Sequence, residues 1–239
     1  HDTAIAYFDA VAKQGSDPHQ VAHAKSELAG LYFEQGKGEG KNPIPVEDRP
    51  AAFQAARALC DEISFGGEET PRDRKMVADL MYFESYYFEK DYQSAYMYGQ
   101  DFFSKWGTDP LVYEAKNERI YVNTAKTFMV MLAYLTDHYA ESLALAEDIT
   151  ANPPPRSEQF RSFDAYMYAC VCGALASEAV GQSGDANYYE QLGLDHFADH
   201  YNLLRPSLEQ KKAKYTAFLH SQKDNQMAHA VQATWMIID

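Results

Sequence analysis

Tight corners between helical segments recur along the chain and constrain its fold more than any other feature. The stretch FEKDYQSAYMYGQDFFSKWGTDP, residues 88–110, has a helical pattern that breaks at Lys90-Asp91, resumes at once and stops before Pro110. Similar short breaks occur at Asp137-His138 and at Gly184-Asp185. A pattern that turns within a few residues and continues as helix predicts two antiparallel helices. We therefore expect a series of helical hairpins.

The corners are evenly spaced. With Ala95, Ser142 and Tyr189 taken as equivalent positions after the turn, each is 47 residues from the next. No alternating strand pattern accompanies them. Self-similarity at a period of roughly 20 to 50 residues is typical of repeat proteins. The expected fold class is therefore all-α.

Helix start and stop signals predict one helical repeat domain over residues 1–239. Asp17-Pro18 supplies a capping residue and a proline for a helix start. The segment GKGEGKNPIPVEDRP, residues 36–50, predicts a long loop. Residues 1–15 are expected to be the remaining helix of a preceding hairpin, in a chain cut from a longer protein. A removed signal peptide or a remnant of a tag would give the same start. The five expected hairpins are residues 17–66, 71–107, 110–152, 155–203 and 206–239.

One unit of the series carries a family resemblance. In residues 77–110, Tyr86 lies nine residues before Ala95, Asp91-Tyr92 occupies the turn and Phe102 lies seven residues after. This unit resembles the tetratricopeptide repeat, and SELAGLYFEQGKG, residues 26–38, resembles the related Sel1-like repeat. The resemblance implies a right-handed superhelical array of antiparallel hairpins, an α-solenoid. The spacing exceeds the about 34 residues of a tetratricopeptide repeat, so we expect irregular hairpins with long first helices.

The same resemblance implies a concave groove lined by first helices. Its expected positions are aromatic and acidic and include no lysine, arginine or asparagine, so a ligand ending in a carboxylate is disfavoured. An apolar or basic peptide or protein is favoured instead. Alternatively, the aromatic side chains pack between neighbouring hairpins. The expected groove positions are His23, Ser26, Phe33, Leu80, Glu84, Tyr87, Phe88, Thr127, Met131, Tyr134 and Glu178.

Composition excludes several kinds of partner. The 21 lysines and arginines are outnumbered by 35 aspartates and glutamates, and the formal net charge of −14 repels nucleic acid and anionic membrane surfaces. No run of about 18 apolar residues is present, so membrane insertion is not expected. Cys60, Cys170 and Cys172 are expected to be small core residues. The cytoplasm and the periplasm both suit this composition, and no oligomeric state is predicted.

Motifs for catalysis and for metal binding are incomplete. His19 and His23 have the i, i+4 spacing of a zinc site, but Gln20 stands where a metalloprotease needs glutamate. His196 and His200 repeat the spacing without an identifiable third ligand. No Gly-x-Ser-x-Gly elbow, phosphate-binding loop or cysteine-protease signature occurs. We therefore expect no catalytic residue, no cofactor and no native metal.

Three interpretations of function follow. The first is a non-enzymatic scaffold that binds a peptide or helix in its groove. The second is the ligand-sensing or interaction region of a larger signalling protein, because tetratricopeptide arrays are found beside sensor kinases and transcriptional regulators. The third, a metal-dependent hydrolase, requires a bound metal or a buried acid pair. The first two are favoured and overlap.

Overall fold

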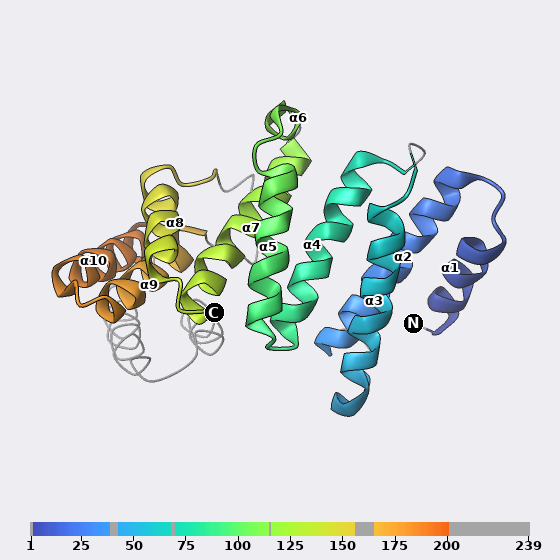
Figure 1. The fold of residues 1–239 in the computed structure, drawn as a ribbon, viewed down its shortest axis with the longest axis horizontal. Helices are drawn as coiled ribbons and strands as arrows, with labels where there is room; N and C mark the ends of the chain where they lie inside the picture. Colours follow the sequence, from blue (N-terminus) through green and yellow to red (C-terminus); the bar gives the residue numbers. More distant parts are fainter. Residues whose placement is uncertain (1, 39–42, 68–69, 115, 156–164, 201–239) are drawn as a thin grey trace. The chain divides into compact units, whose positions relative to one another are not determined.

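The computed structural model describes residues 2–38, 43–67, 70–114, 116–155 and 165–200. Within these ranges every regular element is a helix, which confirms the all-α prediction (Figure 1). The chain divides into two compact units, residues 1–122 and 123–239, and each is described by itself. The expected hairpin at 206–239 lies outside the described residues.

In the first unit, the long helices follow one another as antiparallel neighbours (Figure 1). Each packs against the next, and α2 also contacts α4. The short elements η1 and α6 belong to the connections between them. The elements are α1 (Asp2–Gln14), α2 (Pro18–Lys37), η1 (Val46–Asp48), α3 (Arg49–Ser64), α4 (Arg72–Phe88), α5 (Tyr92–Trp106) and α6 (Pro110–Glu114).

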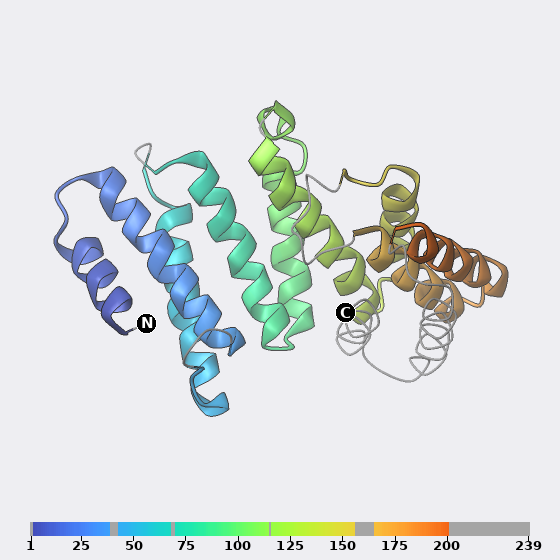
Figure 2. The ribbon, with the colours of Figure 1, turned by 180° about the vertical axis from the view of Figure 1, so that it is seen from behind.

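The second unit begins within α7 (Lys116–Leu135) and is organised around α9. The helix α9 (Ala165–Ala179) packs against both α8 (Tyr139–Ala151) and α10 (Ser183–His200), and Figure 2 shows the three from behind. Its side chains from Met167 to Ser177 are all buried. A helix that is apolar on every side is expected to be enclosed by its neighbours.

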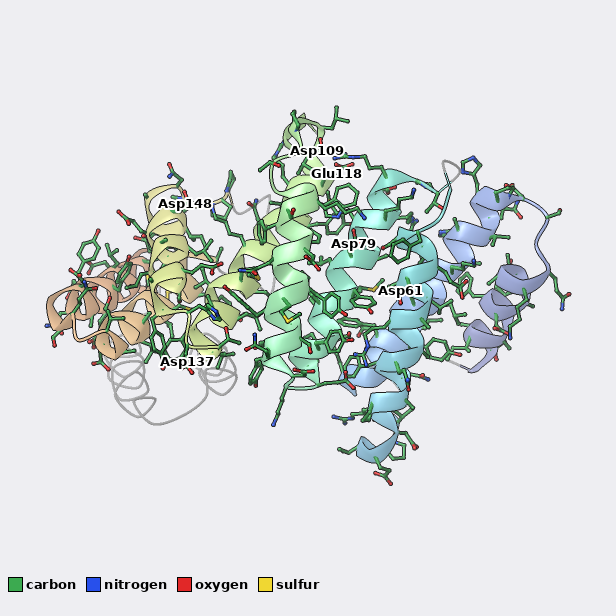
Figure 3. All side chains as sticks on the ribbon, viewed as in Figure 1. Asp61, Asp79, Asp109, Glu118, Asp137 and Asp148 are labelled. Carbon is green, nitrogen blue, oxygen red and sulfur yellow. The ribbon has the colours of Figure 1, made fainter. Side chains whose placement is uncertain are left out.

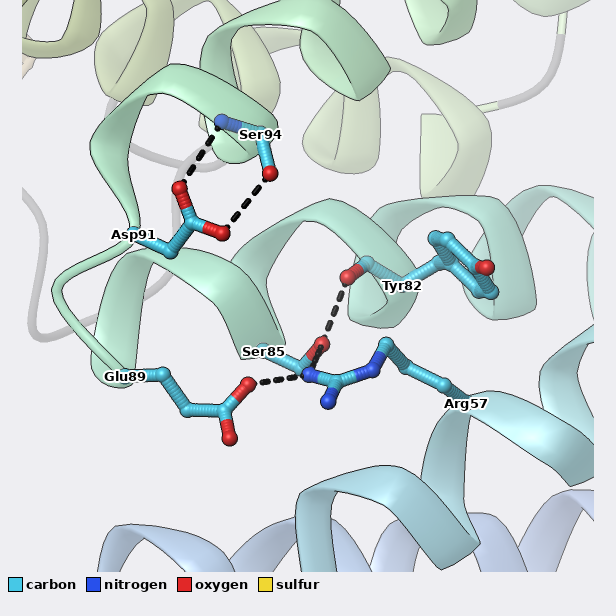
Figure 4. Close-up of polar contacts among 6 residues, drawn as sticks. All are labelled: Arg57, Tyr82, Ser85, Glu89, Asp91 and Ser94. Carbon is cyan, nitrogen blue, oxygen red and sulfur yellow. Dashed lines mark hydrogen bonds and ion pairs between the residues drawn. The ribbon is translucent and has the colours of Figure 1, made fainter. Parts of the chain in front are cut away.

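Capping aspartates begin two helices where the sequence predicts them. The Asp17 side chain accepts a hydrogen bond from the His19 N–H at 3.0 Å. The Asp91 side chain accepts from the N–H of Ser94 at 3.2 Å and from its hydroxyl at 2.7 Å (Figure 4). These bonds satisfy amide groups that the first turn of a helix leaves without partners.

Three hairpin corners share one backbone geometry. At each corner a residue adopts a left-handed conformation, and the next N–H bonds to the carbonyl five residues earlier, as in the Schellman motif. The left-handed residues are Lys90, Asp137 and Gly181, with φ of 65°, 64° and 79°. The N–H donors are Asp91, His138 and Gln182, whose bonds to the acceptor oxygens measure 3.0, 2.8 and 2.8 Å.

The third corner lies earlier than the even spacing predicts. The expected turn at Gly184-Asp185 falls inside α10, so taking Tyr189 as the residue after the corner was wrong. Gln182 is the N–H donor at this corner. Ala186 lies four residues after it and donates its own N–H to the Gln182 carbonyl at 3.1 Å. Glycine and aspartate are typical of turns, but an aspartate in the first turn of a helix is stabilised by the helix dipole.

A small residue therefore follows all three corners. Ala95, Ser142 and Ala186 are buried, and each donates its N–H to the carbonyl four residues earlier. At the second corner the Ser142 hydroxyl also donates to the Val130 carbonyl of α7 at 2.9 Å. A small side chain at this position lets the two helices of a hairpin approach each other.

Candidate functional site

The expected groove positions differ widely in exposure. His23, Phe88 and Glu178 are exposed, whereas Glu84 and Tyr134 are half-buried. The remaining six are enclosed by neighbouring residues and contribute to packing, which corrects the expectation that they line an open surface. The enclosed positions are Ser26, Phe33, Leu80, Tyr87, Thr127 and Met131.

Aromatic packing accounts for Phe33 and Phe88 in the first unit. The Phe33 ring meets the rings of Phe53 and Phe88 edge-on, with centroids 5.9 and 5.7 Å apart. The Lys37 ammonium lies 5.2 Å from the centroid of Phe33 and 5.6 Å from that of Phe88. It also pairs with Glu34 at 3.0 Å. These contacts join α2, α3 and α4, in agreement with the packing alternative for this part of the aromatic set.

Glu84 is the acidic member of the expected groove that belongs to this region. Burial raises the pKa of Glu84 from its ordinary value of 4.5 to about 8, and the charge of Glu34 adds to the rise. The ammonium of Lys37 acts in the opposite direction. The carboxyl is therefore protonated at pH 7 in the folded protein.

The raised pKa of Glu84 predicts a pH-dependent stability. Between pH 4.5 and about 8 the folded state keeps a proton that the unfolded state has released, so stability falls as the pH rises through this window. We expect Glu84→Gln to unfold at a higher urea concentration than the parent protein at pH 9. At pH 4.5 or below, the two should unfold at nearly the same urea concentration. Unfolding is followed by circular dichroism.

The control is Glu34→Gln, because Glu34 pairs with Lys37 and is 43% exposed. Burial is the largest cause of the raised pKa of Glu84, so this variant should keep most of the fall in stability between pH 4.5 and 8. An unchanged pH dependence in Glu84→Gln would contradict the assignment.

A polar cluster ties α3 to α4. Arg57 Nη1 donates to the Ser85 hydroxyl at 2.9 Å and to the Glu89 carboxylate (Figure 4). Its guanidinium lies 4.3 Å from the centroid of the Tyr86 ring, which stacks on Tyr98 at 5.2 Å. Because the charge of Arg57 already has carboxylate and aromatic partners, this cluster explains packing rather than ligand binding.

A second cluster surrounds the start of α4. Arg72 donates to Asp109 at 2.6 Å and to Glu118, and its guanidinium lies 5.3 Å from the Trp106 ring. The two carboxylates are labelled in Figure 3. The Trp106 indole N–H donates to Asp79 at 2.7 Å. These groups also satisfy one another, so the cluster stabilises the loop that follows α5.

An open groove crosses the second unit between α8 and α10, with a volume of about 610 Å³. This falls within the roughly 300 to 1,000 Å³ of small-ligand pockets. The wall from α8 carries mainly small or aliphatic side chains, and the wall from α10 carries two tyrosines. We call this the α8–α10 groove. Its lining residues are Ala140, Leu143, Ala144, Glu147, Thr150, Ala151, Tyr166, Gln182, Asp185, Tyr188, Tyr189 and Leu192.

Tyr189 is the most enclosed side chain of the lining, with 7% of its surface exposed. Its ring packs on Gly173 of α9, where an added Cβ would lie 2.7 Å from the ring atoms. The hydroxyl makes no hydrogen bond to another described residue. Burial raises the pKa of Tyr189 to about 12, and the charges of Glu147 and Asp185 add to the rise. The hydroxyl therefore stays protonated and can donate or accept a hydrogen bond.

Two carboxylates make the groove negative. Glu147 stands on α8 and Asp185 on α10, and both are exposed. Neither has a cationic partner within the described part of the chain, and the described lining contains no lysine or arginine. Such a groove attracts cations and repels anions.

The structure describes both side chains of the first histidine pair and one side chain of the second. His196 stacks on Tyr166 with centroids 4.4 Å apart, and the side chain of His200 lies outside the described ones. His19 and His23 are both exposed, and His23 lies 3.7 Å from Glu27. Among the described side chains, no group of three or more His, Cys, Asp or Glu is placed to hold a metal ion.

The α8–α10 groove was not predicted from the sequence. The tetratricopeptide resemblance implied a surface of first helices, whereas this groove is lined mainly by the helices that follow the corners. Tyr189 was assigned to the position after a corner rather than to a groove. A usable signal was present in the small and aliphatic residues that repeat at helical spacing on α8, with Glu147 as the charged residue among them.

Comparisons with known proteins identify no relative. No protein-family model, no curated protein and no solved structure matches the chain. The molecule is an all-helical protein whose consecutive helices pack as adjacent pairs. None of the described helices combines the length and the apolar composition that crossing a membrane requires.

Proposed function

We propose that the protein is a non-enzymatic interaction scaffold whose α8–α10 groove binds a peptide or a helix of a partner protein. The open groove is the observation that carries this proposal. It combines aromatic and aliphatic surface with a few polar groups that lack partners among the described residues, a composition typical of binding sites. Tyrosines offer a large contact area with few rotatable bonds.

The fold that we propose for this scaffold is a right-handed, tetratricopeptide-like array of hairpins. The recurring corner supports it, because the same backbone bonds and a small residue recur at Ala95, Ser142 and Ala186. The contact between α2 and α4 supports it too, since stacked hairpins bring successive first helices together.

The wall formed by α8 favours a polypeptide as the occupant. Ala140, Ala144 and Ala151 are exposed and carry no side chain beyond Cβ. A peptide backbone or a helix can therefore approach α8 closely along the groove. The carboxylates disfavour an acidic partner, which leaves an apolar or basic segment.

The test is a selection of 12-residue peptides from a random display library on the whole chain. We expect enriched peptides to lose at least tenfold in affinity for Ala144→Trp, because the indole fills the groove from an exposed position. The control is Ala51→Trp, the same change at an exposed position of α3. It should bind as the parent does.

Enriched peptides that bind Ala144→Trp and the parent equally would contradict the proposed site. An absence of enriched peptides would contradict the scaffold function itself. Far-ultraviolet circular dichroism of both tryptophan variants checks that the helices are retained.

A further inference from the structure

We infer that the α8–α10 groove selects a lysine or arginine side chain of its partner, held by Glu147 and Asp185 against the rings of Tyr188 and Tyr189. This inference rests on the proposed function and adds the chemical group that the groove recognises.

The first argument is negative charge that no cation of the described chain neutralises on the two walls of the groove. Glu147 and Asp185 stand on opposite walls of the groove without a cationic partner among the described residues. The next residue along α8, Asp148, lies outside the groove lining and pairs with Lys126. Carboxylates bind ammonium and guanidinium groups through charge-assisted hydrogen bonds. A cation of the partner would supply the positive charge that the described chain does not place beside these two carboxylates.

The second argument is the presence of aromatic surface beside the carboxylates. Tyr188 is 59% exposed, and its ring meets that of Tyr189 edge-on with centroids 5.5 Å apart. A cation over an exposed ring gains about 0.5–1 kcal/mol, and more when it is desolvated. A ring beside a carboxylate therefore suits a basic side chain better than either group alone.

The first unit shows the same combination already occupied. Lys37 lies over Phe33 and pairs with Glu34. Arg57 lies over Tyr86 and pairs with Glu89. In both cases a ring and a carboxylate hold a cation of this chain. The groove offers rings and carboxylates, and no cation of the described chain lies among them.

The third argument is the hydroxyl of Tyr189. Tyr189 is 7% exposed, and its hydroxyl makes no hydrogen bond to another described residue; it is not one of the fully buried polar atoms without a partner, so it is open to the groove. The hydroxyl lies in the groove lining, where an ammonium or guanidinium group can donate to it.

Other ligand classes satisfy these groups less well. A carboxylate or phosphate ligand would be repelled by Glu147 and Asp185. A wholly apolar segment would take both carboxylates out of water without compensating them, which is costly. Only a cationic side chain fits the rings and the charges together.

The test uses the peptides that the display selection enriches on the whole chain. Each is also synthesised with acetyl-lysine for lysine and citrulline for arginine, changes that remove the charge and keep the length. We expect the neutral versions to bind at least tenfold more weakly, measured by calorimetry, because a hydrogen bond to a charged group is lost. The double variant Glu147→Gln, Asp185→Asn should bind charged and neutral versions alike. The control Asp148→Asn should keep the preference for charge.

The outcomes separate this inference from the scaffold function. Enriched peptides that lack lysine and arginine, or that bind equally well when neutralised, would overturn the inference while the scaffold function stands. If no enriched peptide loses affinity for Ala144→Trp, both the inference and the scaffold function of this groove are overturned. If the double variant fails to fold, the comparison of charged and neutral peptides on the parent protein still decides the matter.

Discussion

Replacing Phe83 by alanine is expected to lower the free energy of unfolding by about 3–5 kcal/mol. Phe83 is fully buried and meets Phe102 edge-on with centroids 5.8 Å apart, where α4 packs on α5. The substitution removes apolar contact and leaves a cavity between two helices that can close only in part. Urea unfolding followed by circular dichroism measures the loss.

Phe65→Ala is the matched control. Phe65 is 87% exposed at the end of α3, so the same substitution removes almost no buried contact. The change in the free energy of unfolding should stay within about 0.5 kcal/mol. Equal effects of the two substitutions would mean that α4 and α5 do not pack as described.

Gly173→Val is expected to destabilise the second unit and to disturb the groove. A Cβ at this position meets three ring atoms of Tyr189 at 2.7 to 2.8 Å. The ring is rigid, so it can relieve this overlap only by moving as a whole. Valine adds two methyl groups to that overlap, so we expect a loss of about 1–3 kcal/mol or more. Because Tyr189 must move, peptide affinity at the groove should fall as well.

The control for this change is Gly184→Val in the first turn of α10. An added Cβ there meets no atom within 4 Å. We expect the free energy of unfolding to change by less than about 1 kcal/mol and peptide binding to be retained. Calorimetric unfolding and a binding titration on both variants check the pair. A Gly173→Val protein with parental stability and affinity would show that Tyr189 does not rest on α9.

Much of the secondary structure follows from local signals in the sequence. Asp17 and Asp91 cap helices where their residue types predict, because a side-chain oxygen satisfies amides that the first turn leaves free. The corner at Lys90 is also placed correctly. There the helix must end in a left-handed residue although lysine has no preference for that conformation.

The third corner shows where local signals fail. Gly181 is the left-handed residue, but Gly184 and Asp185 three positions later have the more turn-like composition. The choice between them depends on which small residue packs against α9. Ala186 is buried after the corner, whereas Tyr189, three residues later, packs its ring on Gly173 of α9. Such a choice is decided by tertiary packing, which a sequence pattern does not contain.

The groove was missed for a related reason. Whether Glu147 faces water or a groove depends on the position of α10, and no spacing within α8 records that position. Likewise, Tyr87 and Met131 were expected on an open face but are enclosed by neighbouring residues. Helical periodicity shows which residues share a face, whereas contacts between helices decide which face is covered.

Nuclear magnetic resonance of the tyrosine rings, recorded during a titration with n-butylammonium ion, tests the central claim most directly. This ion carries the charged end of a lysine side chain without any peptide around it. The account predicts chemical-shift changes at Tyr166, Tyr188 and Tyr189, with smaller changes in Glu147→Gln, Asp185→Asn and none with uncharged n-butanol. Shifts concentrated on Tyr86 and Tyr98, or no response to the ion at all, would contradict a cation-binding groove between α8 and α10.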